Sequence, residues 1–139
     1  MANAVYPLYK QTLLTNAATN ISLDQDTTAD GPYCSLVDTG TYTYSASHQF
    51  FSSLAGIQGT DQRVAVPTVV NGTLKGNNLT YTAVSGVSIE SLVIYRHNSG
   101  ANTTWRLVVY LDTGITGLPV TPNGGDISVT WDATGIFSL

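Results

Sequence analysis

The sequence predicts an all-β fold, mainly antiparallel, arranged as a single-domain β-sandwich or barrel-like sheet with one or two short helices near the N-terminal half. Composition is the first reason. The 139 residues include 20 Thr and 13 Val, which favour the half-buried surface of a pleated sheet, but only one Glu and two Lys. Pattern is the second reason, because apolar and polar residues alternate in short runs bounded by Gly, Pro, Asn and Asp.

The length fits one β-rich domain covering residues 1–139, with 1–18 as an N-terminal arm or short helix. Charged residues make up 10% of the chain and the net charge is −4, which argues against a nucleic-acid binder that uses a basic surface. No run approaches the ~18 apolar residues of a membrane helix, so no membrane partner is expected. A surface of hydroxyls and amides suits a protein that is packed in an assembly.

The N-terminal segment has helical spacing. Pro7 suits a first helical turn, and Tyr6, Tyr9 and Leu13 recur near the period of a helix. A short helix that ends within residues 15–20 is therefore expected. The alternative is an extended arm over residues 4–9 that docks on a neighbouring molecule.

The first half then alternates as strands do. Extended runs are expected at residues 21–24, 33–38 and 64–66. Tyr42 and Tyr44 share one face of a further extended run. Ser45 or Ser47 could cap a second short helix that contains His48, Phe50, Phe51 and Leu54.

The second half gives the clearest pattern. Residues 92–96 and 105–111 flank a polar loop at 97–104, which predicts a β-hairpin with a long tip. Further strands are expected at 79–84, 127–132 and 136–139. The total of roughly seven to nine strands at even spacing is typical of a sandwich or barrel.

No catalytic, cofactor-binding or metal-binding residues are predicted. Glu90 is the single Glu, and the two histidines are far apart in the sequence. Asp24, Asp26 and Asp30 indicate a polar loop, with a calcium loop as the weaker alternative because the Gly and closing Glu of an EF-hand are missing. Cys34 is the single cysteine and is expected to be a small buried hydrophobe.

The aromatic side chains leave two interpretations open. They could form a platform for sugar rings, or they could pack within the sheets and at a subunit interface, where Tyr and Trp are enriched. The second interpretation is favoured, and Trp131 is expected in the core. The residues concerned are Tyr42, Tyr44, Tyr81, Tyr95, Trp105, Tyr110 and Trp131.

Three stretches carry a family resemblance. They are VYPLYKQTLL at residues 5–14, SLVDTGTYTYSASHQF at 35–50 and GLPVTPNGGDISVTWD at 117–132. The chain resembles small structural proteins in the virions of tailed bacteriophages, some of which decorate or cement the head. The match is weaker over residues 56–78.

This resemblance implies a non-enzymatic virion protein, in first place a capsid decoration (cement) protein on the outer surface of the capsid, made in the host cytoplasm. It implies the major capsid protein as partner, and a symmetric homo-oligomer, a trimer being favoured. It supplies no catalytic residue. The interface residues expected from exposure are Val5, Tyr6, Tyr9, Tyr42, Tyr44, His97 and Trp105.

Two other functions remain open. A tail, neck or fibre-associated virion protein would be present in few copies. A carbohydrate-binding module for host attachment would expose several aromatic rings in one groove, with Tyr42 and Trp105 as candidates.

Overall fold

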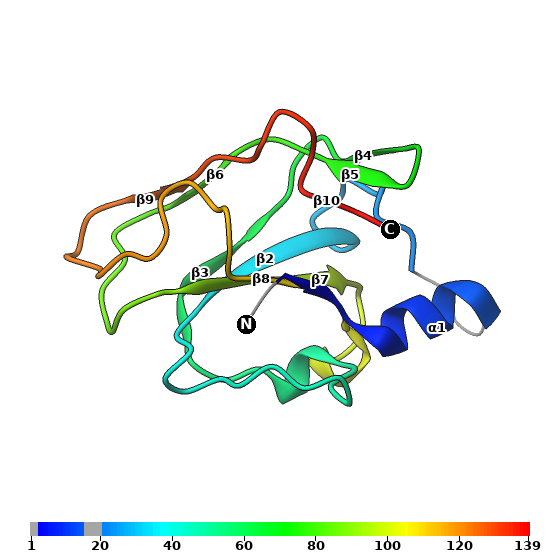
Figure 1. The fold of residues 1–139 in the computed structure, drawn as a ribbon, viewed down its shortest axis with the longest axis horizontal. Coiled ribbons are helices and arrows are strands. Elements are labelled where there is room, and N and C mark those ends of the chain that lie inside the picture. Colours follow the sequence, from blue (N-terminus) through cyan, green and yellow to red (C-terminus); the bar gives the residue numbers. More distant parts are fainter. Residues whose placement is uncertain (1–2, 16–20) are drawn as a thin grey trace.

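A five-stranded antiparallel sheet in the order β1-β8-β7-β2-β3 forms the middle of the molecule (Figure 1). The computed structural model describes residues 3–15 and 21–139. The central strands β2, β7 and β8 are buried on both faces, so their sequences are nearly continuous apolar runs. The strands are β1 (Ala4–Val5), β2 (Gly31–Val37), β3 (Ile57–Arg63), β7 (Ser91–His97) and β8 (Arg106–Leu111).

The predicted hairpin is confirmed as β7 and β8. Leu92 lies opposite Leu111 and Ile94 lies opposite Val109, after which the register shifts at a β-bulge before Tyr95. The loop between the strands contains a short 3-10 turn, η2 (Asn102–Thr104). The hairpin therefore forms the centre of the sheet, with β1 and β2 as its outer neighbours.

Two small sheets cover one face of the five-stranded sheet (Figure 1). The first has the order β10-β5-β4 and the second pairs β6 with β9. The arrangement is an open sandwich, and no sheet closes into a barrel among residues 3–15 and 21–139. The strands are β4 (Thr68–Val70), β5 (Thr73–Lys75), β6 (Leu79–Tyr81), β9 (Ile127–Val129) and β10 (Phe137–Ser138).

The opposite face is covered by the connection between β2 and β3 (Figure 1). This connection carries the aromatic rings of Tyr42, Tyr44 and Phe51, which pack on Tyr95 and Tyr110 of the sheet. An irregular segment can cover a sheet face in this way because its large rings provide the buried area that a second sheet would otherwise supply.

The N-terminal helix is present as α1 (Pro7–Thr15), which follows β1 directly. The extended arm over residues 4–9 is not seen. Ala4 and Val5 instead pair with Tyr110 and Val109 of the same chain, and Pro7 begins the helix. The remainder of the expected segment, residues 1–2 and 16–18, lies outside the described residues.

Three other local predictions were wrong. Residues 21–24 form no strand: Arg96 binds the carbonyl of Ser22, and no strand within residues 3–15 and 21–139 pairs with this segment. Residues 64–66 follow the end of β3, and Val66 has a φ of 50°, which no regular strand contains. The second helix is only the 3-10 turn η1 (Phe51–Ser53), without a side-chain cap from Ser45 or Ser47.

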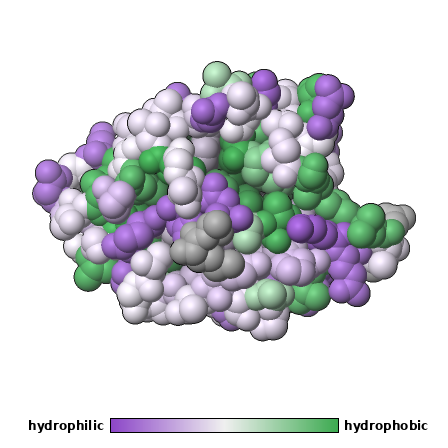
Figure 2. Space-filling view, in the orientation of Figure 1, coloured by the Kyte–Doolittle hydropathy of each residue, from purple (hydrophilic) through white to green (hydrophobic). Residues whose placement is uncertain are grey.

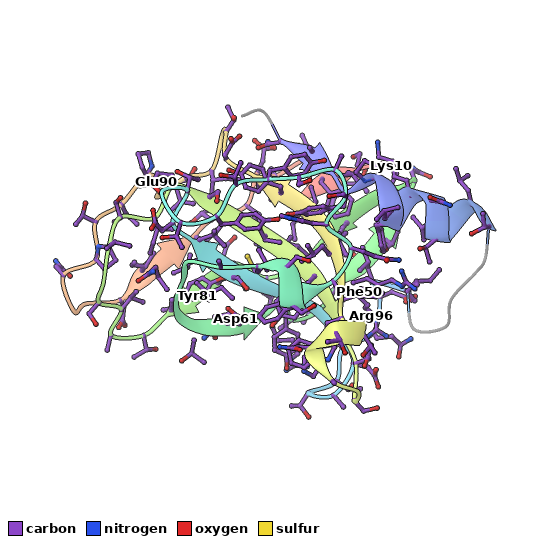
Figure 3. All side chains as sticks on the ribbon, turned by 90° about the horizontal axis from the view of Figure 1, so that it is seen from below. Lys10, Phe50, Asp61, Tyr81, Glu90 and Arg96 are labelled. Atoms are coloured by element: carbon purple, nitrogen blue, oxygen red, sulfur yellow. The ribbon has the colours of Figure 1, made fainter. Side chains whose placement is uncertain are left out.

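A buried arginine holds the segment 21–30 against the sheet. Arg96 is 2% exposed, and its Nε donates to the carbonyl of Ser22 at 2.5 Å. Its guanidinium also contacts the carboxylate of Asp30 at 3.4 Å and donates to the carbonyl of His97. Glu90 and Arg96, at either end of β7, lie far apart in the molecule (Figure 3).

Candidate functional site

The tyrosines that were expected at an interface belong largely to the interior. Tyr6, Tyr9 and Tyr42 are 0%, 3% and 3% exposed. The hydroxyl of Tyr42 lies 2.8 Å from the hydroxyl of Tyr6 and 2.8 Å from Nδ1 of His48. Because these polar ends find partners inside the fold, three of the seven expected residues keep almost no exposed surface.

The other four expected residues keep part of their surface. Val5 is half-buried in β1, and Tyr44 is half-buried over Tyr6 and Tyr110. His97 and Trp105 are half-buried and lie together at the hairpin tip, with ring centroids 4.1 Å apart. The structure thus divides the expected interface into separate places rather than one patch.

The hairpin tip is held by its own hydrogen bonds. The indole Nε1 of Trp105 donates to the carbonyls of Asn98 and Gly100, at 3.0 and 2.9 Å. Asn98 Oδ1 accepts from the backbone N–H of Gly100 at 2.7 Å and from the hydroxyl of Thr104 at 3.1 Å. These contacts give Trp105 a structural role, with its ring stacked on Tyr95.

An open groove with carboxylates and tyrosines lies where β7 begins and β8 ends. We call it the tyrosine–acid groove, and its volume is about 370 Å³. Glu90 Oε2 accepts from the N–H and hydroxyl of Thr39 at 3.0 and 3.2 Å, and Oε1 accepts from Ser88. These hydrogen bonds lower the pKa of Glu90, and the one from Ser88 has the largest effect. The groove is lined by Thr39, Tyr42, Thr43, Tyr44, Glu90, Tyr110 and Asp112.

The chemistry of the tyrosine–acid groove is that of weak polar recognition. Only Tyr44 among its three tyrosines is more than slightly exposed, since Tyr42 and Tyr110 are each 3% exposed. Glu90 is ionised at neutral pH and its oxygens already accept hydrogen bonds. The groove therefore offers one aromatic ring beside acceptor groups.

A buried carboxylate lies between the sheet and its aromatic cover. Asp61 of β3 accepts a 2.8 Å hydrogen bond from the hydroxyl of Tyr95 through Oδ2. Its Oδ1 and the Oγ of Ser35 have no hydrogen-bond partner among the described residues. Burial raises the pKa of Asp61, and the neighbouring hydroxyls of Tyr95 and then Ser35 offset this only in part. Figure 3 labels Asp61 in a view of this face from below.

Neither a metal centre nor a reactive thiol is formed by the described residues. No group of three or more His, Cys, Asp or Glu side chains could hold a metal among residues 3–15 and 21–139. Asp26 instead binds Arg63 and the backbone N–H of Val66. Cys34 is fully buried as expected, and burial raises the pKa of its thiol to about 12.

A hollow whose larger part is mainly apolar runs along β10. We call it the apolar seam. Its two parts have volumes of about 370 and 250 Å³, and Phe137 lines both. Figure 2 shows apolar surface between the upper layer and α1. The principal lining residues are Val5, Tyr9, Leu13, Leu74, Val109 and Phe137.

Exposed apolar side chains continue from the apolar seam over the neighbouring small sheet. Val69 and Val70 of β4 are 47% and 60% exposed, and Leu139 is 63% exposed. Val69 lies opposite Leu74 and lines the seam together with Leu139, whereas Val70 lies opposite Thr73 and points to the other face of the small sheet. Contiguous exposed apolar surface is typical of an interaction site.

The sequence did not point to this surface. Val69 and Val70 follow Pro67 in a run without a clear alternation, and Phe137 is separated from Val5 by most of the chain. The available signal was the group of four valines in a charge-free stretch, residues 64–74, of which all but Val64 are exposed in the structure.

Comparison with known proteins gives no family. No family model matches the chain, and no relative is found among curated proteins. None of the helices in the described part of the chain is long and apolar enough to cross a membrane.

Proposed function

We propose that this chain is a non-enzymatic structural protein of a phage virion, and that it is a capsid decoration protein which binds the assembled head lattice. The observation that carries the proposal is the apolar surface formed by the seam and by the exposed side chains of Val69 and Leu139 that line it. In a chain with 10% charged residues, such a surface is suited to a permanent contact with another protein.

The sequence resemblance supplies the partner, the major capsid protein. A protein that binds the assembled shell but not free shell subunits stabilises the shell by mass action. The proposal includes a closed symmetric oligomer, a trimer in first place, because such an oligomer can match the symmetry axes of a shell.

Fractionation of virions tests this location. Heads and tails are separated on a density gradient, and the chain is quantified in each fraction by mass spectrometry. The proposal expects the chain in the head fraction, and heads stripped of it should break at lower temperature and regain stability when it is added back. Recovery in the tail fraction would instead favour the tail, neck or fibre alternative.

A carbohydrate-binding role is the second candidate, and the tyrosine–acid groove is the observation that favours it. Tyr44 would stack on a sugar ring while Glu90 accepts hydrogen bonds from its hydroxyls. Titration with host surface glycans, followed by tyrosine fluorescence, would show saturable binding that Tyr44→Ala abolishes and Trp105→Ala leaves unchanged.

A further inference from the structure

The backbone beside the apolar seam is arranged as an open strand edge. In the pairing of β10 with β5, the N–H of Leu139 donates to the carbonyl of Gly72 at 3.0 Å. Since hydrogen-bonded and non-hydrogen-bonded pairs alternate in an antiparallel ladder, the N–H and C=O of Ser138 point away from β5. The edge of the small sheet therefore faces the seam with backbone groups that pair with no strand in the described part of the chain.

The same geometry occurs on the other side of the seam. The N–H of Tyr6 donates to the carbonyl of Val108 at 2.9 Å, and Val5 lies opposite Val109. By the same alternation, the N–H and C=O of Val5 point away from β8. Both layers of the sandwich thus end at the seam in a strand edge.

Open strand edges select the kind of molecule that fits the seam. A lipid or a small apolar molecule would fill the volume but would not pair with the backbone groups at Ser138 and Val5. An extended peptide fills the volume with alternate side chains and pairs its own backbone with the edge. The seam therefore suits an added β-strand.

Charge and length narrow the description of that strand. Asp24 is the one charged residue among the described residues that line the seam, and it lies at the α1 end. The nine residues of α1 extend ~13 Å and the two of β1 ~7 Å, so an extended segment along them needs about six residues. Complementarity predicts apolar residues with one Lys or Arg near Asp24.

We propose that the apolar seam receives an extended segment of a shell subunit, about six residues long and mainly apolar with one basic residue, which pairs with the free edge of β10. This inference rests on the proposed function for the source of the segment. It adds the site, the binding mode and the chemistry of the bound segment, so that each decoration protein completes its own sandwich with a strand from the shell.

Photo-crosslinking in assembled particles tests the proposal. A photoreactive phenylalanine analogue replaces Leu139 at the seam, and in a matched control it replaces Val87, which is 53% exposed and does not line the seam. The probe at position 139 should crosslink to one segment of the shell protein with the predicted composition, and the probe at 87 should not. Crosslinks from 139 to a second copy of the chain, or to no protein, would overturn the inference.

A backbone substitution gives the second test. Ser138→Pro removes the outward N–H without removing a hydrogen bond to β5, and Ser138→Ala controls for the lost hydroxyl contact with Thr73. The Pro variant should bind stripped heads at least about tenfold more weakly than the Ala variant, while both melt at the same temperature. Equal binding by the two variants would overturn the strand pairing.

Binding to heads separates a failure of the proposed function from a failure of the seam inference. If the unmodified chain does not bind heads at all, the proposed function is wrong, and the shell protein does not supply the segment that the seam binds. If the chain binds heads but neither position 139 nor Ser138 affects the contact, the function stands and this inference is wrong.

Discussion

The hydroxyl of Tyr95 donates a 2.8 Å hydrogen bond to Oδ2 of Asp61 beneath the aromatic cover of the sheet. This contact joins the central strand β7 to the edge strand β3, two strands that do not pair directly. The remaining oxygen, Oδ1, is itself buried and makes no hydrogen bond of good geometry among the described residues, so this partly buried carboxylate is incompletely solvated.

Asp61→Asn should therefore stabilise the protein at neutral pH. A raised native pKa means that the folded chain holds the proton of Asp61 more tightly than the unfolded chain. The stabilisation that Asp61 contributes is fully present below 3.8, the pKa of its carboxyl group in the unfolded chain. It is lost as the pH rises through the raised pKa of the folded chain. The Asn variant should lack this loss and gain ~1 kcal/mol at pH 7, where the unpaired oxygen is replaced by a donor.

Urea unfolding of both proteins between about pH 3 and about pH 8 measures the effect. The lower limit lies about one unit below the ordinary pKa of Asp, and the upper limit lies well above it. The difference in unfolding free energy should grow with pH and then level off. A variant that is less stable than the natural chain at pH 7 would contradict this description of Asp61.

The Tyr6–Tyr42–His48 chain of hydrogen bonds predicts an order of stabilities. Tyr42→Phe removes both 2.8 Å contacts and leaves the hydroxyl of Tyr6, which is fully buried, without that partner. Tyr6→Phe leaves Tyr42 still bonded to His48. Thermal unfolding should show a loss of ~2 kcal/mol for Tyr42→Phe and ~1 kcal/mol for Tyr6→Phe. Equal losses, or the reverse order, would show that the chain does not act as a unit.

Two arginine–aspartate contacts differ in burial and should differ in strength. Arg96, 2% exposed, anchors the segment 21–30 through Ser22 and Asp30, whereas Arg63 and Asp26 form a pair with side chains 32% and 38% exposed. Arg96→Met should cost ~3 kcal/mol because buried acceptors lose a charged donor. Arg63→Met should cost less than ~1 kcal/mol. Chemical denaturation of the two variants makes the comparison, and similar costs would refute the anchoring role of Arg96.

The central hairpin could be predicted because its signals are local. Residues 92–96 and 105–111 are long, apolar and separated by a polar loop, and they became β7 and β8. The helix at Pro7 was predicted for the same reason. Residues 21–24 show equally good alternation but have no strand beside them, and Arg96, distant in sequence, fixes them instead.

The candidate surfaces were harder to predict because they depend on which residues the fold buries. Tyr6 and Tyr42 appear alike in sequence to Tyr44, yet only Tyr44 keeps exposed area, since the other two hydroxyls bond to each other. The apolar seam joins Val5 to Phe137, and no local pattern connects the two ends of the chain. Trp131, expected in the core, is half-buried and donates its indole N–H to the carbonyl of Asn77 at 2.9 Å.

The number of copies per virion tests the central proposal most directly. Quantitative mass spectrometry of purified particles, with the major shell protein as internal reference, gives this number. A decoration protein should be present in a fixed ratio to the shell protein. Its number of copies should match the number of shell subunits or of symmetry positions in the lattice. A handful of copies per particle, or none, would contradict the proposal that the chain binds the head lattice.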